Sequence, residues 1–160
     1  MQTLVLGIGN LLMNDDAAGV RVVQALAEKF VFPENVKLLD GGTLGLDLLP
    51  HLEGIDRLLV IDAVETGHET GTLIRLSGDE IPLTLATKVS PHQMGLKDLL
   101  LVADLQGYAP PEMVLWGVQP GSIEMDIEMS PAVAEAVVLL EDRVLAELAL
   151  WGISPTPVSA

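Results

Sequence analysis

Apolar residues along the chain fall into two patterns, short continuous runs and longer stretches with helical spacing. The short runs are four to eight residues long, end at glycine or polar residues, and are apolar on both faces, which is typical of buried parallel strands. LLVIDAV, within residues 57–64, is the clearest of them. This pattern predicts five strands, at residues 3–8, 36–39, 57–64, 71–76 and 113–118.

The helical pattern predicts four helices between and after these strands. In residues 16–30 the apolar positions recur every three or four residues, and Asn14, Asp15 or Asp16 is expected to cap the start. Ser130-Pro131 is expected to start the last helix, because proline is favoured at the first helical position. The predicted helices are residues 16–30, 44–52, 94–105 and 131–150.

Strands that alternate with helices indicate an α/β fold. The expected architecture has three layers: a twisted, mostly parallel sheet of about five strands with helices on both faces. We predict one domain over residues 1–150, followed by a flexible C-terminal tail at residues 151–160, which mixes Pro, Ser and Gly. Sites in such sheets form beyond the carboxyl ends of the strands, so the loops there hold the candidate residues.

Composition narrows the function classes. The chain has no cysteine, which excludes disulfides, thiolate metal sites and cysteine nucleophiles. Its net charge of −15 argues against nucleic acid and against anionic membrane surfaces, although the charge also serves solubility. No basic leader precedes Asp15 and Asp16, and no apolar run reaches the roughly 18 residues of a membrane helix. A cytoplasmic protein without membrane insertion is expected.

The first predicted strand leads into Gly7-Ile8-Gly9-Asn10 and then Asp15-Asp16. This segment is half of a dinucleotide fingerprint, but Leu12 stands where the third glycine belongs. Two aspartates near a helix start also repel phosphate, so a nucleotide site is disfavoured. One aspartate suffices for a helix cap, which leaves the second, Asp16, as a candidate for metal binding or catalysis.

Two further candidates lie near predicted carboxyl ends of strands. Asp62 closes the third run, where a carboxylate faces either the site crevice or a loop that it caps. His92 lies in SPHQMG directly before a helix, in a loop stiffened by Pro91. Together, Asp16, Asp62 and His92 offer two carboxylates and one imidazole, a plausible open site for a divalent ion.

The remaining glycine-rich turn is Asp40-Gly41-Gly42-Thr43-Leu44-Gly45. Its glycines permit a close approach of another chain, so the turn either presents backbone amides to a peptide or simply connects a strand to a helix. His51 and His68 lie in polar surroundings and are expected to be solvent-exposed.

Taken together, these motifs resemble the nickel–iron hydrogenase maturation proteases. The resemblance covers nearly the whole chain, from Leu4 to Leu148, and its motifs occur in the family's order. They are GIGNLLMNDDAAGVRVVQAL, LLDGGTLGLDLL, VIDAV, SPHQMGLKDLL and LWGVQP.

The resemblance implies an endopeptidase that removes a C-terminal extension from a nickel-loaded hydrogenase large-subunit precursor. It places the metal-binding positions on Asp16, Asp62 and His92, although many members carry Glu at the first. The ion, nickel supplied by the substrate or another divalent ion in its place, is either recognised or catalytic, and Asp16 or Asp40 is the candidate base. A monomer is expected. A nickel-dependent chaperone that does not cut, and a peptidase of the same fold with another substrate, remain alternatives.

Overall fold

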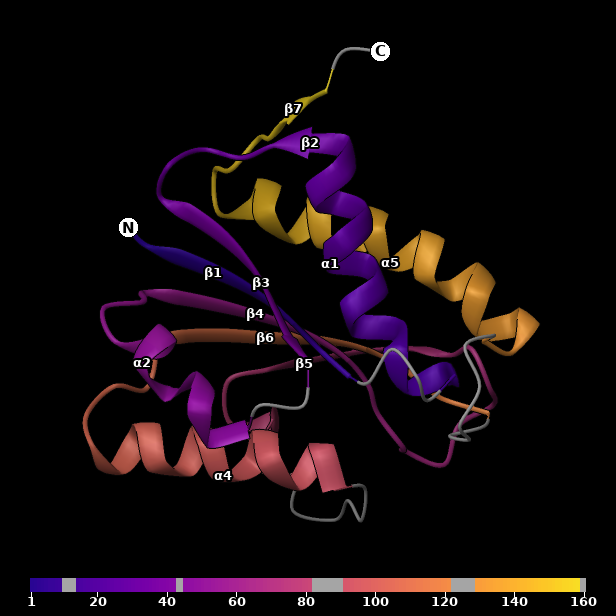
Figure 1. Ribbon diagram of the computed structural model, residues 1–160, viewed down its shortest axis with the longest axis horizontal. Helices are drawn as coiled ribbons and strands as arrows, with labels where there is room; N and C mark the ends of the chain where they lie inside the picture. The colour runs from indigo at the N-terminus through magenta and orange to yellow at the C-terminus, as the bar shows by residue number, and fades with distance from the viewer. Residues whose placement is uncertain (10–13, 43–44, 82–90, 122–128, 159–160) are drawn as a thin grey trace.

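The computed structural model describes residues 1–9, 14–42, 45–81, 91–121 and 129–158. For Asn14, Asp16, Gly45 and residues 91–95 it describes the backbone alone. The architecture is an α/β sandwich of three layers, as predicted (Figure 1).

A five-stranded sheet forms the middle layer, in the order β3-β1-β4-β6-β5. The strands β3, β1, β4 and β6 run parallel, and β5 pairs antiparallel with β6 at one edge. Their bounds are β1 Thr3–Ile8, β3 Val36–Gly42, β4 Arg57–Ala63, β5 Leu73–Ser77 and β6 Glu112–Val118. The predicted mostly parallel sheet of five strands is therefore confirmed.

Helices cover both faces of the sheet (Figure 1). One face carries α1, Ala18–Lys29, and α5, Pro131–Leu150; the other carries α4, Pro91–Leu105, with the short η2, Gly45–Leu48, and α2, Leu49–Leu52. Side chains of β4 alternate between the two cores: Leu59 and Ile61 pack with α1 and α5, whereas Leu58 and Val60 pack with α4. Burial on both faces explains the continuous apolar run.

The start of α1 differs from the expected one. A 3-10 turn, η1, spans Asn14–Ala17, and the N-cap residue of α1 is Ala17, whose side chain makes no cap hydrogen bond. Asp15, one of the expected caps, is instead bonded to Gly121 and Ser130, and the side chains of Asn14 and Asp16 lie outside the described part of the structure. The glycine-rich turn also differs, because Asp40, Gly41 and Gly42 continue β3 and only the next residues leave the sheet.

Packed structure continues beyond residue 150, where the sequence analysis expects a flexible tail at residues 151–160. Ile153 is buried in the core shared by α1 and α5. After it, β7, Thr156–Pro157, pairs antiparallel with β2, Phe30–Val31, in a second, two-stranded sheet. Within the described residues, no helix combines the length and hydrophobicity that crossing a bilayer requires.

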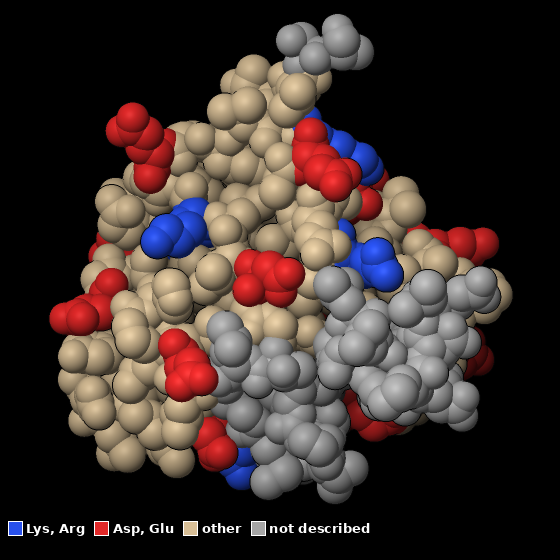
Figure 2. All heavy atoms as spheres, viewed as in Figure 1, with Lys and Arg blue, Asp and Glu red and all other residues tan. Residues whose placement is uncertain are grey.

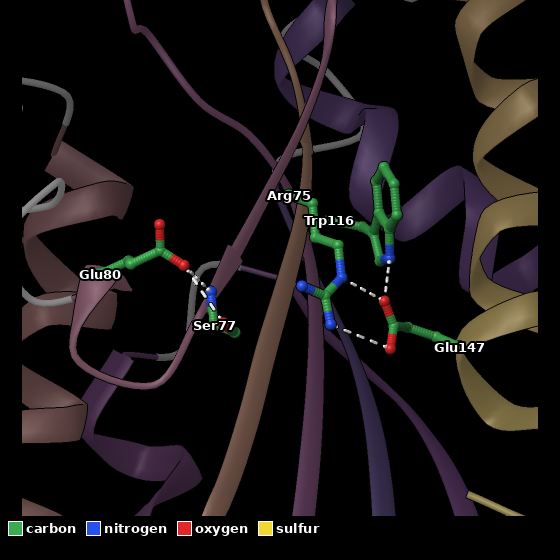
Figure 3. A network of polar contacts seen from close by, with 5 residues as sticks. All are labelled: Arg75, Ser77, Glu80, Trp116 and Glu147. Carbon is green, nitrogen blue, oxygen red and sulfur yellow. Dashed lines mark hydrogen bonds and ion pairs between the residues drawn. The ribbon is translucent and has the colours of Figure 1, made fainter. Parts of the chain in front are cut away.

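Polar contacts tie α5 to the sheet (Figure 3). Arg75 on β5 donates from Nε and Nη2 to the two carboxylate oxygens of Glu147, and Trp116 Nε1 on β6 donates to Oε1 at 3.0 Å. Hydrogen bonding by Arg75, and then by Trp116, lowers the pKa of Glu147, although burial opposes this shift. Glu147 is therefore held as a carboxylate inside an otherwise apolar interface.

Candidate functional site

The carboxyl ends of the parallel strands meet the starts of two helical segments. In Figure 1, η1 follows β1 at this end, and α4 begins at the same end. The η1 turn also contacts β4 directly. This is the end of the sheet where the sequence predicts a site.

A close approach of backbones sets the position of η1. A Cβ on Gly19 would lie 2.0 Å from the carbonyl oxygen of Ile61 and 2.6 Å from that of Ile8. A Cβ on Gly7 would likewise lie 2.5 Å from the carbonyl oxygen of Gly19. These two glycines let the first turn of α1 rest directly on β1 and β4. The Asp15-Asp16 pair is thereby brought to the mouth of the sheet.

Asp15 has a structural role that the sequence did not reveal. Its side chain is fully buried and accepts hydrogen bonds from the Gly121 amide at 2.7 Å, the Ser130 amide at 2.7 Å and the Ser130 hydroxyl at 2.6 Å. Three donors to one carboxylate satisfy its charge in a buried position. Asp15 thus joins η1 to the end of β6 and to the residue that precedes α5.

Asp62 lies at the carboxyl end of β4 and is fully buried. Its Oδ1 accepts a hydrogen bond from the Ala63 amide at 2.8 Å. Because side chains alternate along a strand, Asp62 projects to the same face as Val60, the face that α4 covers. A carboxylate is thereby present inside the molecule at the predicted site, on the face of the sheet that α4 covers.

The other two predicted metal ligands are placed by their backbones alone. Asp16 belongs to η1 and His92 is the second residue of α4, so both come from segments at the carboxyl end of the sheet. Their side chains lie outside the described part of the structure. Among the side chains that are described, no three acidic or histidine residues gather around a common point. A common metal site of Asp16, Asp62 and His92 therefore stays a prediction.

Asp40 is separated from Asp62 by the geometry of the sheet. It is exposed, its Oδ1 accepts a hydrogen bond from the Gly42 amide at 3.0 Å, and it is paired in register with Gly7. Gly7 is paired in turn with Ile61, so Asp40 stands two strand spacings, roughly 10 Å, from β4. Alternation along β3 directs Asp40 to the α1 face. Asp40 and Asp62 therefore cannot bind one ion.

Comparison with known proteins decides between the remaining interpretations. The family model described as hydrogenase maturation protease (HycI) matches residues 20–147, most of the chain. The chain belongs to the hydrogenase maturation protease family. It is 39% identical to the Hydrogenase 2 maturation protease of Escherichia coli over 161 residues, which cover 100% of this chain and 98% of the relative.

Other relatives of the protease agree in sequence and in fold. The chain is 45% identical to the hydrogenase expression/formation protein HupD of Rhodobacter capsulatus, over 97% of this chain and 75% of that protein. The solved structure of the hydrogenase maturating endopeptidase HybD from E. coli superposes with a TM-score of 0.93 at 39% identity, covering 98% of both chains. A maturation protease from Thermococcus kodakarensis has a TM-score of 0.75 at 30% identity, over 90% and 97% of the two chains.

These results make the protein an endopeptidase of hydrogenase maturation and favour it over a binding module that does not cut. In the protease, the described part of the site offers a buried carboxylate, Asp62, and an exposed one, Asp40, on opposite faces of the sheet. Because they lie on opposite faces, Asp62 and Asp40 are better placed to act at two different points of a substrate than to work as a paired acid and base.

A second residue missed from the sequence is Gln119, at the carboxyl end of β6. It is 3% exposed, and its side-chain amide contacts residues 65–68 of the loop between β4 and β5. The signal was present in the motif LWGVQP, where a polar residue directly follows a buried strand. An uncharged amide stands out less in a sequence than the acids and histidines that mark a metal or acid–base site.

Proposed function

We propose that this protease removes the C-terminal extension of a nickel-loaded nickel–iron hydrogenase large-subunit precursor, in the cytoplasm and as a monomer. Support comes from the shared family, from near-complete coverage of relatives named for hydrogenase maturation, and from the acidic character of the molecule. Figure 2 shows Asp and Glu side chains spread over the viewed face, with the few Lys and Arg side chains lying apart. Such a surface suits a partner that carries a cation.

The observation that carries the proposal is the burial of Asp62. A carboxylate with no exposed surface at the end of an apolar strand is costly unless a cation or donors compensate it. Carboxylate oxygens and imidazole nitrogens are ligands that suit a borderline divalent ion such as nickel. The donor set of Asp16, Asp62 and His92 therefore fits a nickel ion that arrives on the precursor, and other divalent ions are expected to substitute.

In this proposal the three residues contact the nickel of the substrate, and cleavage waits for correct loading. A carboxylate, Asp16 or Asp40, then accepts a proton from the water that attacks the scissile carbonyl. If Asp40 is the base, its separation from Asp62 means that proton transfer occurs at the peptide, away from the ion; if Asp16 is the base, the same residue serves both tasks. The leaving amine takes a proton as the peptide bond breaks.

The experiment compares cleavage of nickel-loaded and nickel-free precursor by mass spectrometry of the products. The wild-type protease should remove the extension from the loaded precursor alone. Asp16→Asn, Asp62→Asn and His92→Ala should each lower the cleavage rate by at least about 100-fold, because each alters a direct ligand and losing a residue that merely supports a ligand already costs about 10–100-fold. The exposed residues Asp47 and His51 supply matched controls, since Asp47→Asn and His51→Ala should cleave normally.

Two results would contradict this proposal. Equal cleavage of nickel-free precursor would remove the metal-recognition role of the three residues. Normal cleavage by Asp62→Asn, with its fold verified by circular dichroism, would show that the buried carboxylate serves the fold alone.

A further inference from the structure

The connection between β4 and β5 stays at the mouth of the site for its whole length. Because β5 runs antiparallel to β6, the chain leaves β4 and enters β5 at the same end of the sheet. Gly71 N donates to the carbonyl of Gln119, and Gln119 N donates to that of Thr72, both at 2.9 Å, which fixes the end of this loop on β6. The loop is thus held beside the carboxyl end of β4, where Asp62 lies.

The Gln119 side chain holds the first half of the loop. Its Oε1 accepts hydrogen bonds from the amides of Thr66 at 2.8 Å and His68 at 3.3 Å. Its Nε2 donates to Glu65 Oε2 at 2.8 Å and to the Pro120 carbonyl at 3.2 Å. Reversing the amide would set an NH2 group against two backbone N–H donors, so the donor and acceptor ends are fixed.

This orientation determines where the protons on Thr66 and His68 lie. Thr66 Oγ1 is 3.1 Å from Gln119 Oε1 and 2.5 Å from His68 Nδ1. In the 3.1 Å contact the Thr66 hydroxyl donates to Gln119 Oε1; a hydroxyl that donated to His68 instead would leave two acceptor oxygens facing each other. With its proton on Gln119, the hydroxyl oxygen is an acceptor toward His68, and Nδ1 is then the nitrogen that carries the ring proton. In the neutral ring, Nε2 keeps its lone pair.

We propose that Gln119 is a positioning residue for substrate binding, which acts through Thr66 to present Nε2 of His68 as a hydrogen-bond acceptor. Nε2 accepts a hydrogen bond from a backbone N–H of the precursor chain near the cleavage site. This inference rests on the proposed function. A peptide N–H fits better than a metal ion, because His68 is exposed and belongs to no group of three potential ligands among the described side chains.

The first test reads the imidazole tautomer by nitrogen NMR of the whole protein without substrate. In the wild type, His68 should be protonated at Nδ1 when the ring is neutral. Thr66→Val removes the hydroxyl at nearly constant shape, and Gln119→Met removes the amide, so each should shift His68 toward the Nε2-protonated form. A wild-type His68 that is already protonated at Nε2 would overturn the inference, whatever the protein cleaves.

The second test measures kcat and KM with nickel-loaded precursor. A His68→Gln side chain places its carbonyl oxygen near the position of Nε2, whereas His68→Asn reaches only as far as Nδ1. His68→Asn and Thr66→Val should raise KM about tenfold at unchanged kcat, the size of one hydrogen bond, and His68→Gln should restore most of the affinity. His51→Asn is the matched control and should leave KM unchanged.

The outcomes separate this inference from the function on which it rests. If the wild type does not cleave the precursor, the proposed function falls, and the substrate contact of His68 falls with it. If the wild type cleaves but His68→Asn keeps the wild-type KM, only the inference is overturned. A fall in kcat at constant KM would also overturn it, because it would assign His68 to the chemical step.

Discussion

The carbonyl oxygen of Gly19 in α1 lies 2.5 Å from the point where Gly7 in β1 would carry a Cβ. Helix and strand therefore touch through their backbones, with the Val23 side chain packed beside the contact at 2.7 Å from the same point. The contact places η1 above the ends of β1 and β4. The same two glycines, Gly7 and Gly19, therefore contribute to the stability of the fold and to the position of Asp16.

Gly19→Ala should destabilise the protease strongly. The added methyl group would meet the carbonyl oxygens of Ile61 and Ile8, which are backbone atoms that cannot rotate away. We expect a loss of at least about 3 kcal/mol in the free energy of unfolding, measured with urea, because over-packing of this kind costs about 1–3 kcal/mol even where side chains can adjust. Ala27→Ser, at an exposed position of the same helix, should cost about 0.5 kcal/mol or less. Similar losses in the two variants would contradict the close packing of Gly19.

The two adjacent aspartates should have different roles: Asp15 should be needed for stability and Asp16 for precursor cleavage. Asp15→Asn replaces an oxygen that accepts buried hydrogen bonds by an NH2 group, so the free energy of unfolding should fall by about 1–3 kcal/mol. Asp16→Asn should leave stability within about 0.5 kcal/mol and abolish precursor cleavage. Thermal unfolding and the cleavage assay on both variants test this, and a stable Asp15→Asn would refute the assignment.

Acid should weaken the contact between α5 and the sheet through Glu147. Its pKa lies below the ordinary value of 4.5 in the folded protein, so its carboxylate stabilises the fold above about pH 4.5. This contribution is lost as the pH falls through the lower folded value. Glu147→Gln should lower the free energy of unfolding by about 1 kcal/mol at pH 7, since Arg75 is partly exposed to solvent.

The difference between wild type and Glu147→Gln should shrink as the pH falls from about 4.5 through the lower folded pKa, because the wild-type residue becomes protonated in the unfolded state first and then in the folded state. Urea unfolding at a series of pH values measures it. Glu135→Gln, on an exposed face of α5, is the control and should show a small difference. A difference that grows toward low pH would contradict the role of the carboxylate.

The C-terminal segment should contribute to stability through Ile153. This side chain is 7% exposed and packs in the core below α1 and α5. Ile153→Ala should cost about 2–4 kcal/mol, the usual effect of removing a buried side chain of this size. Val158→Ala, at a half-exposed position beyond β7, should cost less than about 0.5 kcal/mol. Differential scanning calorimetry distinguishes the two, and equal melting temperatures would support a tail without structural importance.

The parts of the fold that could be predicted from sequence are those with a local pattern. The buried run before Gly9 gives β1, and the spacing of Val133, Val137, Leu140 and Val144 gives α5 with its correct ends. The position of Asp62 followed from the same logic, because the end of a buried strand is visible in the sequence. The direction of the Asp62 side chain, toward α4, could be assigned only from the alternation of side chains along β4 in the structure.

Features held by distant partners could not be predicted. Asp15 finds its donors more than 100 residues away, in Gly121 and Ser130, and nothing near it in the sequence marks them. The pairing of β2 with β7 joins two strands of two residues each, which are too short to show any periodicity. Gln119 was missed for a related reason, since its role depends on a loop that precedes it by some 50 residues.

The reversed direction of β5 keeps the connection between β4 and β5 at the entrance of the site. A crossover helix would carry the chain back to the far end of the molecule, but the return through β5 leaves residues 64–72 at the entrance alone. Val64 is buried in the core on the α4 side, and Gly71 and Thr72 are hydrogen-bonded to Gln119, so both ends of this stretch are tied to the scaffold. Residues 65–70 between them can change in length or composition without moving the strand register. Exchanging these residues with those of a relative of the same scaffold would therefore test whether they carry partner preference.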